Sequence, residues 1–326
     1  MKKNLRRLTR VALVMSVLAG SQPGWTQSYP VRPVRFIVPT SPGGGNDIQA
    51  RIIAQTLTES FRQQVVVDNR PGAAGIIGTE LGVKAPPDGY TILMGNTGTI
   101  AAAKALARNL AYDPAKDLVP VVQLSATPFL LVVHPALPAR SMHEFIAYAK
   151  SKAGQLNYGS SGTGQTPHLA MELFKSMAGV NLVHVPYKGT GPAITDLLGG
   201  QVQAMINTAL PLLPHVRSGK LRALAVTSPK RARALPDLPT VAESGLPGYE
   251  VTIWYGVFVP LKTPSRVVTI LNREINQAIQ AKEFEGRISS DGAEVVGGAP
   301  AGFAKFIDLE VAKWTRVVKL SGATIE

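Results

Sequence analysis

The sequence predicts an α/β protein of two lobes, and three features support this fold class. Short apolar segments alternate with amphipathic segments along most of the 326 residues, the order typical of parallel sheets covered by helices. Two long extended segments, Val119–Val133 and Tyr249–Val259, interrupt this alternation. Glycine-rich or hydroxyl-rich loops follow several predicted strands. We therefore expect one lobe inserted into the other, two chain crossings that form a hinge, and a ligand cleft between two open sheets.

The first lobe is expected to begin with a β-α-β-α-β unit, because each short apolar run is followed by a turn and a helical pattern. Its predicted elements are strand Val34–Pro39, helix Ile48–Arg62, strand Val65–Asp68, helix Ile76–Ala85 and strand Thr91–Gly95. After the second extended segment, helices Ser265–Ala281 and Pro300–Leu320 complete the chain. This order predicts a parallel sheet with helices on both faces.

The second lobe is expected to repeat the alternation between the two extended segments. Its predicted elements are helix Ser141–Lys152, strand Leu156–Gly159, helix His168–Met177, strand Val183–Pro186, helix Ala193–Gly199, strand Ala204–Asn207, helix Leu210–Ser218 and strand Ala223–Val226. We assign residues 28–127 and 250–326 to lobe 1 and residues 128–249 to lobe 2.

The N-terminal segment predicts export. Residues 2–10 carry five basic side chains and no acidic one, Val11–Ala19 is apolar, and Gly20-Ser21 follows. This pattern is typical of a signal peptide, and its apolar part is too short to span a bilayer as a helix. We assign residues 1–27 to the signal peptide and expect the mature protein in the periplasm.

Composition excludes several classes of site. The chain has no cysteine, so disulfides, cysteine-zinc sites and thiol nucleophiles are excluded. The five histidines lack metal-binding spacing, and we expect no metal and no cofactor. The formal net charge is +13, of which +8 remains outside the first ten residues, where Lys and Arg are scattered. We therefore expect no nucleic-acid partner, and a monomer that attracts anions mildly.

The first candidate ligand loop lies between the first predicted strand and helix. Its candidate residues are Ser41, Gly43, Gly44, Gly45, Asn46 and Asp47. Three consecutive glycines let the backbone approach a ligand closely, and free N–H groups at a helix start favour an anion. Asn46 or Asp47 can cap the helix. An ordinary turn with a capping residue remains the alternative.

The second candidate loop joins a strand to a helix in the other lobe. Its candidate residues are Ser160, Ser161, Gly162, Thr163, Gly164, Thr166 and His168. These residues offer hydroxyl and amide groups with no charge before His168, so an anion would be held by neutral donors. His168 opens a helix, where we expect it to form a local hydrogen bond. A flexible Gly/Ser linker is the alternative.

Three shorter polar turns follow other predicted strands and are weaker candidates. Their residues are Asn96 and Thr97, Lys188 and Gly189, and Asn207 and Thr208. Lys188 is the one cation among them and equally fits a solvated surface lysine.

Enzyme motifs do not fit. Thr163 breaks the G-x-S-x-G pattern, and the glycines match neither a phosphate loop nor a dinucleotide fingerprint. We therefore expect a binding protein and no catalytic residue. Two other functions remain open: an exported hydrolase, with Ser161 and His168 as first suspects, and a sensor that signals to a membrane partner.

The sequence resembles the Bug-type receptors, the extracytoplasmic solute receptors of tripartite tricarboxylate transporters. The matching segments are Tyr29-Pro30, Arg32-Pro33, Pro42–Asp47, Ala50-Arg51, Asp68–Ala73, Pro87–Thr91, Tyr158–Gly164, His168-Leu169, Val185–Gly189, Asp196–Val202 and Pro239–Glu243. Each segment alone is weak, but their order along the chain is highly specific.

The resemblance implies a periplasmic-binding-protein fold of the second topological type that closes on a small organic carboxylate. It maps the ligand loops onto Ser41–Asp47 and Ser160–Thr166, and it implies permease subunits as further partners. Two residues depart from the family pattern: Thr40 stands where Phe is usual, and Asn46 stands where Thr or Ser is common. Both departures lie near the expected cleft, where they are expected to affect ligand choice.

Overall fold

The computed structural model describes residues 29–107, 109–233, 235–289 and 292–324. The predicted signal peptide, residues 1–27, lies outside the described residues. Before Arg32, the described segment contains a cis peptide bond between Tyr29 and Pro30. The described residues from Arg32 onward form one compact unit. Within the described residues, no helix combines the length and apolarity that crossing a bilayer requires.

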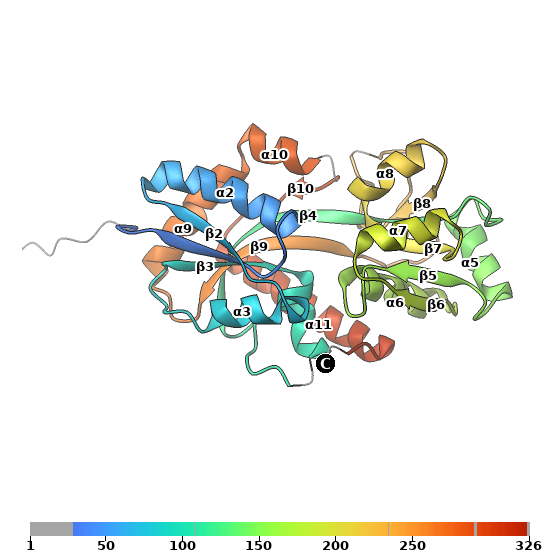
Figure 1. Ribbon diagram of the computed structural model, residues 1–326, viewed down its shortest axis with the longest axis horizontal. Coiled ribbons are helices and arrows are strands. Elements are labelled where there is room, and N and C mark those ends of the chain that lie inside the picture. Colours follow the sequence, from blue (N-terminus) through green and yellow to red (C-terminus); the bar gives the residue numbers. More distant parts are fainter. Residues whose placement is uncertain (1–28, 108, 234, 290–291, 325–326) are drawn as a thin grey trace, which may run out of the picture. The chain divides into compact units, whose positions relative to one another are not determined.

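Two long strands organise the sheet. β4 (Leu118–Val133) and β9 (Thr252–Pro260) pair antiparallel from Leu118 opposite Pro260 to Pro128 opposite Thr252. From Phe129 onward β4 leaves β9 and pairs with β7 (Ala204–Thr208) and β8 (Arg222–Val226). β4 therefore belongs to two groups of strands, and its partners change after Pro128. Figure 1 shows one group toward each end of β4.

The first group contains the predicted parallel strands. Its order is β2-β1-β3-β9-β4, where β1 is Val34–Val38, β2 is Val65–Asn69 and β3 is Thr91–Asn96. β1 pairs parallel with both β2 and β3, which confirms the predicted β-α-β-α-β unit, while β3 pairs antiparallel with β9. The helices of this group are α2 (Gly45–Phe61), α3 (Ile76–Val83), α9 (Ser265–Ile279) and α11 (Pro300–Ser321).

The second group lies at the other end of β4 (Figure 1). β5 (Asn157–Ser160) pairs parallel with β6 (Val183–Pro186) and with β7. Its helices are α5 (Met142–Ser151), α6 (Thr166–Ala178), α7 (Thr190–Leu198) and α8 (Ala209–Arg217). Two sheets joined by long crossing strands confirm the predicted fold class. The boundaries at residues 128 and 250 remain a prediction.

Several elements differ from the sequence prediction. The extended segment expected from Tyr249 becomes a strand only at Thr252, because Tyr249 Oη donates to Ala170 O and Val251 N donates to Thr227 O. The unpredicted elements are a 3₁₀ turn η1 (Ala73–Gly75), a π-helix η2 (Thr97–Ala102), α4 (Ala103–Leu106), α10 (Lys282–Ser289) and β10 (Glu294–Val295).

One residue joins the two crossings. Thr227 is fully buried, and its hydroxyl oxygen accepts the N–H of Phe129 at 2.8 Å. The same hydroxyl lies 2.6 Å from Val251 O, to which it donates. Thr227 thereby ties β4 to the segment that leads into β9, at the place where both cross between the two groups of strands.

Candidate functional site

The start of α2 presents free backbone N–H groups. Its N-cap is Gly44, with an extended backbone and no capping side chain. The expectation that Asn46 or Asp47 caps the helix is therefore wrong: the helix begins at Gly45, so both residues lie inside its first turn. N–H groups of a first turn have no acceptor within the helix, and with the helix dipole they favour a bound anion. Figure 1 shows this end of α2 on the side nearest α7.

Asp47 holds the glycine loop in place. Its Oδ2 accepts from Gly43 N at 2.8 Å and Arg51 Nε at 3.0 Å, and its Oδ1 accepts from Asn69 Nδ2 at 3.0 Å. Burial alone would raise the pKa of Asp47, but hydrogen bonds from Arg51, Gly43 and Asn69 outweigh it and lower the pKa. Both carboxylate oxygens are thus engaged, which favours a supporting role. Arg51 and Asn69 were not predicted as site residues.

Tyr255 on β9 is a further residue that the sequence did not indicate. A β-carbon built on Gly45 would lie 2.5 Å from Tyr255 Oη, so the tyrosine packs directly against the bare Cα of Gly45. Tyr255 is opposite Asn96 in the pairing of β3 with β9. The first glycine of α2 is therefore close to the carboxyl end of β3, across the tyrosine side chain.

The end of β3 leads toward α6. Asn96 Oδ1 accepts from Thr99 N, and Thr99 Oγ1 accepts from Asn96 N, both at 3.0 Å, which starts the π-helix η2. Thr97 is buried, and its hydroxyl accepts from Trp254 N at 3.2 Å. A β-carbon built on Gly98 would lie 3.9 Å from Thr166 Oγ1. The loop after β3 thus approaches the first turn of α6.

The loop before α6 is fixed by two histidines. Ser160 Oγ lies 2.6 Å from His184 Nε2, and it accepts from Gly162 N at 3.2 Å. Gly164 N donates to His168 Nδ1 at 3.1 Å, which confirms the local hydrogen bond expected for His168. Gly162 and Gly164 have φ angles of +139° and +76°, which favour glycine at these positions. His184 was not predicted as a site residue.

The two imidazoles stack on each other, with His168 buried and His184 half-buried. The ring of His184 stacks with those of His168 and Tyr158, whose centroids lie 3.9 Å and 4.9 Å away from its own. Burial, then the proximity of His168 and Lys175, lowers the pKa of His184 to about 4. Burial likewise lowers the pKa of His168, with Glu172 opposing this effect. Because both pKa values lie below the ordinary histidine value, both rings are neutral near pH 7.

The remaining predicted residues of this group lie beside the same loop. Gly189 N donates to Ser161 O at 3.2 Å, and Lys188 is exposed next to it. Asn207 Nδ2 donates to Thr190 Oγ1 at 3.2 Å, and Thr208 N donates to Asn207 Oδ1 at 2.8 Å. Ser41, Gly43, Gly44 and Thr163 are exposed.

The contacts form two linked sets. Gly45, Tyr255 and Asn96 form one set, and Ser160, Ser161 and Gly189 belong to the other. Gly98 and Thr166 meet between them. Ser161 and His168, the suspects for hydrolysis, form no hydrogen bond with each other in the described structure: Ser161 O accepts from Gly189 N, and His168 Nδ1 accepts from Gly164 N.

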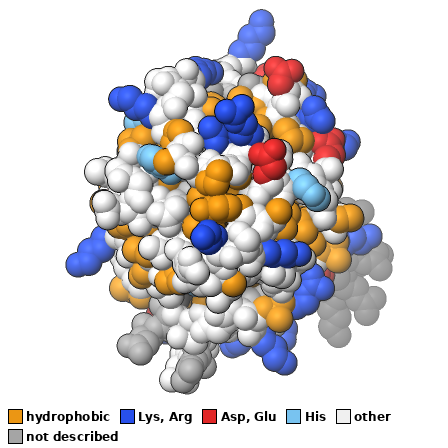
Figure 2. All heavy atoms as spheres, turned by 90° about the vertical axis from the view of Figure 1, so that its right-hand side faces the viewer, with side chains coloured by type: hydrophobic (Ala, Val, Ile, Leu, Met, Phe, Trp, Pro, Cys, Tyr) orange, Lys and Arg blue, Asp and Glu red, His pale blue; other side chains and the backbone are white. Residues whose placement is uncertain are grey.

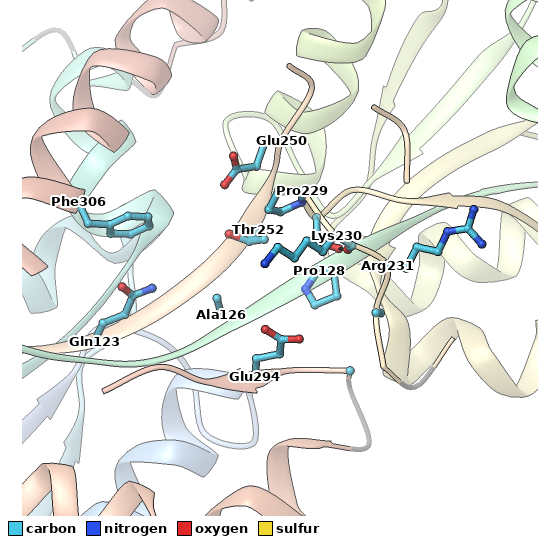
Figure 3. Close-up of a pocket in the computed structure, with 13 residues that line it drawn as sticks. Gln123, Ala126, Pro128, Pro229, Lys230, Arg231, Glu250, Thr252, Glu294 and Phe306 are labelled. Atoms are coloured by element: carbon cyan, nitrogen blue, oxygen red, sulfur yellow. Dashed lines mark hydrogen bonds between the residues drawn. The ribbon is translucent and has the colours of Figure 1, made fainter. Parts of the chain in front are cut away.

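A separate cavity of about 180 Å³ lies along the crossing strands (Figure 3). β4 contributes Gln123, Ala126 and Pro128 to its lining, and none of the predicted site residues lines it. Glu250 and Glu294 also border it, with Lys230 between them in the view of Figure 3. Arg231 also lines it, so two basic and two acidic side chains border this cavity.

Basic side chains are dispersed on the face of the molecule that carries α5. Figure 2 shows the side of the molecule that carries α5. Lys and Arg side chains on this face are separated by polar and apolar regions and form no continuous stripe among the described residues.

Comparisons with known proteins identify similar chains and folds. Residues 49–323 match the family described as "Tripartite tricarboxylate transporter family receptor". Protein BugT of Bordetella pertussis is 38% identical over 325 residues, which cover 99% of this chain and 100% of the relative. The solved structure of R. palustris Rpa4515 with adipate is 39% identical, has a TM-score of 0.80, and covers 91% of this chain and 99% of that one. The solved structure of MatC from Rhodopseudomonas palustris with bound malate is 34% identical and has a TM-score of 0.77. The match covers 89% of this chain and 100% of that one.

Proposed function

Because the chain belongs to the tripartite tricarboxylate transporter receptor family, whose members are periplasmic solute-binding receptors, we propose that its small organic carboxylate binds between residues 41–47 and 160–166. The observation that carries this placement is the uncapped start of α2. Its first residue, Gly45, packs against Tyr255, which is paired with Asn96 at the end of β3. Adipate and malate in the two solved relatives support a carboxylate.

Two lobes are proposed to close on this ligand. We place lobe 1 at residues 28–127 and 250–326 and lobe 2 at residues 128–249, with the hinge where β4 and the segment before β9 cross. A ligand that contacts both lobes favours the closed state over the open one. Neutral donors suit repeated capture and release, because they hold an anion without a buried ion pair.

Delivery to a permease is the proposed outcome of binding. The family works with a tripartite transporter, and we propose that a monomer of this chain passes its ligand to the membrane subunits after export to the periplasm. Pull-down of the ligand-loaded receptor on reconstituted permease subunits tests this step, with the ligand-free receptor as the control.

Titration with matched acids and amides tests the binding proposal. A panel of dicarboxylates, tricarboxylates and aromatic acids is compared with the corresponding neutral amides. A ligand at about 100 times its Kd raises stability by about 2.7 kcal/mol, so a clear rise in melting temperature is expected for an acid and none for its amide. No response to any acid would contradict the proposal, as would equal responses to acid and amide.

A further inference from the structure

An orphaned acceptor lies in the first turn of α2. Among the residues that the structure describes, Asn46 Oδ1 is the buried side-chain atom that has no hydrogen-bond partner. The side chain of Asn46 is 3% exposed, so water at the surface does not satisfy this oxygen. A buried acceptor without a partner destabilises the fold, because it has lost its hydrogen bond to water and gained none. Such an atom needs an explanation, and a bound group that supplies a donor is one.

Asn46 lies at the end of α2 where the carboxylate is proposed to bind. Asn46 continues the buried face of α2 that Ala50 and Ile53 form, one turn nearer the helix start. Its Nδ2 points to Thr40 Oγ1 at 3.4 Å, just beyond the carboxyl end of β1. Ligands of open α/β sheets bind outside these strand ends. Asn46 Oδ1 therefore belongs to the same turn as the free N–H groups.

The neighbouring charges favour a hydroxyl over an ammonium donor. An ammonium group in a buried position needs an anionic partner. The carboxylate in this turn is Asp47, and its oxygens already accept from Gly43 N, Arg51 Nε and Asn69 Nδ2. A neutral hydroxyl needs one acceptor, and Asn46 Oδ1 provides it.

We propose that the ligand is a hydroxycarboxylate, with its carboxylate at the N–H groups that open α2 and its hydroxyl donating to Asn46 Oδ1. This inference rests on the proposed function and narrows its ligand class. Desoxy analogues leave the buried oxygen unsatisfied, so they bind more weakly. An analogue with an amino group in place of the hydroxyl brings a cation to a turn in which no carboxylate oxygen is free.

Calorimetric titration of matched acid pairs tests the proposal on the unmodified protein. The pairs are malate and succinate, citrate and tricarballylate, and lactate and propionate, with aspartate as the amino analogue of malate. We expect the hydroxy acid of the binding pair to bind at least about tenfold more tightly than its desoxy partner and than its amino analogue. Equal affinities within that pair, or tighter binding of aspartate than malate, would overturn the inference while leaving a carboxylate receptor intact.

The variant Asn46→Leu tests whether Asn46 causes the preference for hydroxy acids over desoxy acids. Asn46→Leu removes the acceptor and keeps a similar volume, so the hydroxy-to-desoxy ratio is expected to fall to within about twofold. Asn181→Leu places the same change at an exposed position and should retain the ratio. A ratio that survives in Asn46→Leu contradicts the assignment of the hydroxyl to Asn46. Absence of binding by the whole panel contradicts the proposed function itself, and with it this inference.

Discussion

Ser160 Oγ lies 2.6 Å from His184 Nε2, so a half-buried, stacked histidine holds the first hydroxyl of the loop that precedes α6. Protonation of His184 would place a cation against His168 and Lys175, which are the groups that already lower its pKa together with burial. The order of this loop therefore depends on a neutral imidazole pair.

This arrangement predicts that acid destabilises the protein. His184 has a pKa of about 4 when folded, below the ordinary 6.5. In the window between these values the unfolded chain binds more protons, so stability is complete above the upper value and falls as the pH drops toward the lower one. Melting temperatures recorded from about pH 7 to about pH 5 should decline. Compared with the unmodified protein, the decline in melting temperature should be smaller in His184→Asn. It should be the same in His143→Asn, which alters an exposed histidine. Equal slopes in all three proteins would contradict the assignment.

Gly45 and Gly44 form a matched pair for testing the first loop. Gly45→Ala would place a methyl group 2.5 Å from Tyr255 Oη, whereas the same change at Gly44 meets Ser41 O at an ordinary 3.8 Å. Gly45→Ala is expected to weaken carboxylate binding at least about tenfold, because the helix start or the tyrosine must shift. Gly44→Ala should change the affinity by about threefold or less. Alanine is a poorer N-cap residue than glycine, which should lower the free energy of unfolding by about 1 kcal/mol at most. Calorimetric titration with the same acid checks both, and similar losses in the two variants would refute the role of the Tyr255 contact.

Glu310 is a buried carboxylate that serves two indoles. Its Oε2 accepts from Trp254 Nε1 at 2.8 Å and Trp314 Nε1 at 2.9 Å, and Lys313 pairs with its other oxygen. Glu310→Leu leaves two buried donors without an acceptor and should lower the unfolding free energy by about 2–4 kcal/mol in urea titrations. Glu310→Gln keeps an acceptor oxygen and should lose less than half as much. Equal losses would indicate that the charge of Glu310, and not its acceptance of the two indole N–H groups, determines stability here.

Thr227 offers a test of the crossing. Thr227→Val keeps the shape but leaves Phe129 N and Val251 O without their partner, at a cost of about 1–3 kcal/mol. Thr269→Val makes the same change on an exposed turn of α9 and should alter stability by about 0.5 kcal/mol or less. Urea unfolding of the two variants checks this expectation. A loss at Thr227 no greater than at Thr269 would show that the hydroxyl does not tie the crossings together.

The strands and most helices could be predicted from the sequence because their signals are local. Val34–Val38 and Thr91–Asn96 are apolar runs bounded by turns, and α2 follows a glycine cluster. The helical segment from Thr97 to Leu106 was missed because a polar turn motif at Asn96–Thr99 concealed it. The reciprocal Asn96–Thr99 hydrogen bonds are those of a helix start, so the spacing of these two residues carried the missing signal.

The site was predictable in its loops and not in its supports. Glycine and hydroxyl clusters mark the loops directly in the sequence. Tyr255 and His184 lie on strands β9 and β6, where nothing local shows that one meets Gly45 and the other Ser160. Such contacts join segments far apart in the chain and depend on strand register. For the same reason, the sequence did not show that the oxygens of Asp47 are engaged, while Asn46 Oδ1 is left free.

Because β4 pairs with β9 through Pro128 and with β7 and β8 beyond it, the two halves of this protein are not separable modules. A fragment that ends near Ala126 lacks β9, so β3 and the retained part of β4 lose a neighbour. A fragment that starts there keeps β9 but lacks most of its β4 partner. Either cut exposes a row of unpaired backbone groups, the kind of edge on which chains aggregate. Engineering that swaps ligand-binding halves between relatives must therefore transplant this strand whole, or exchange loops alone.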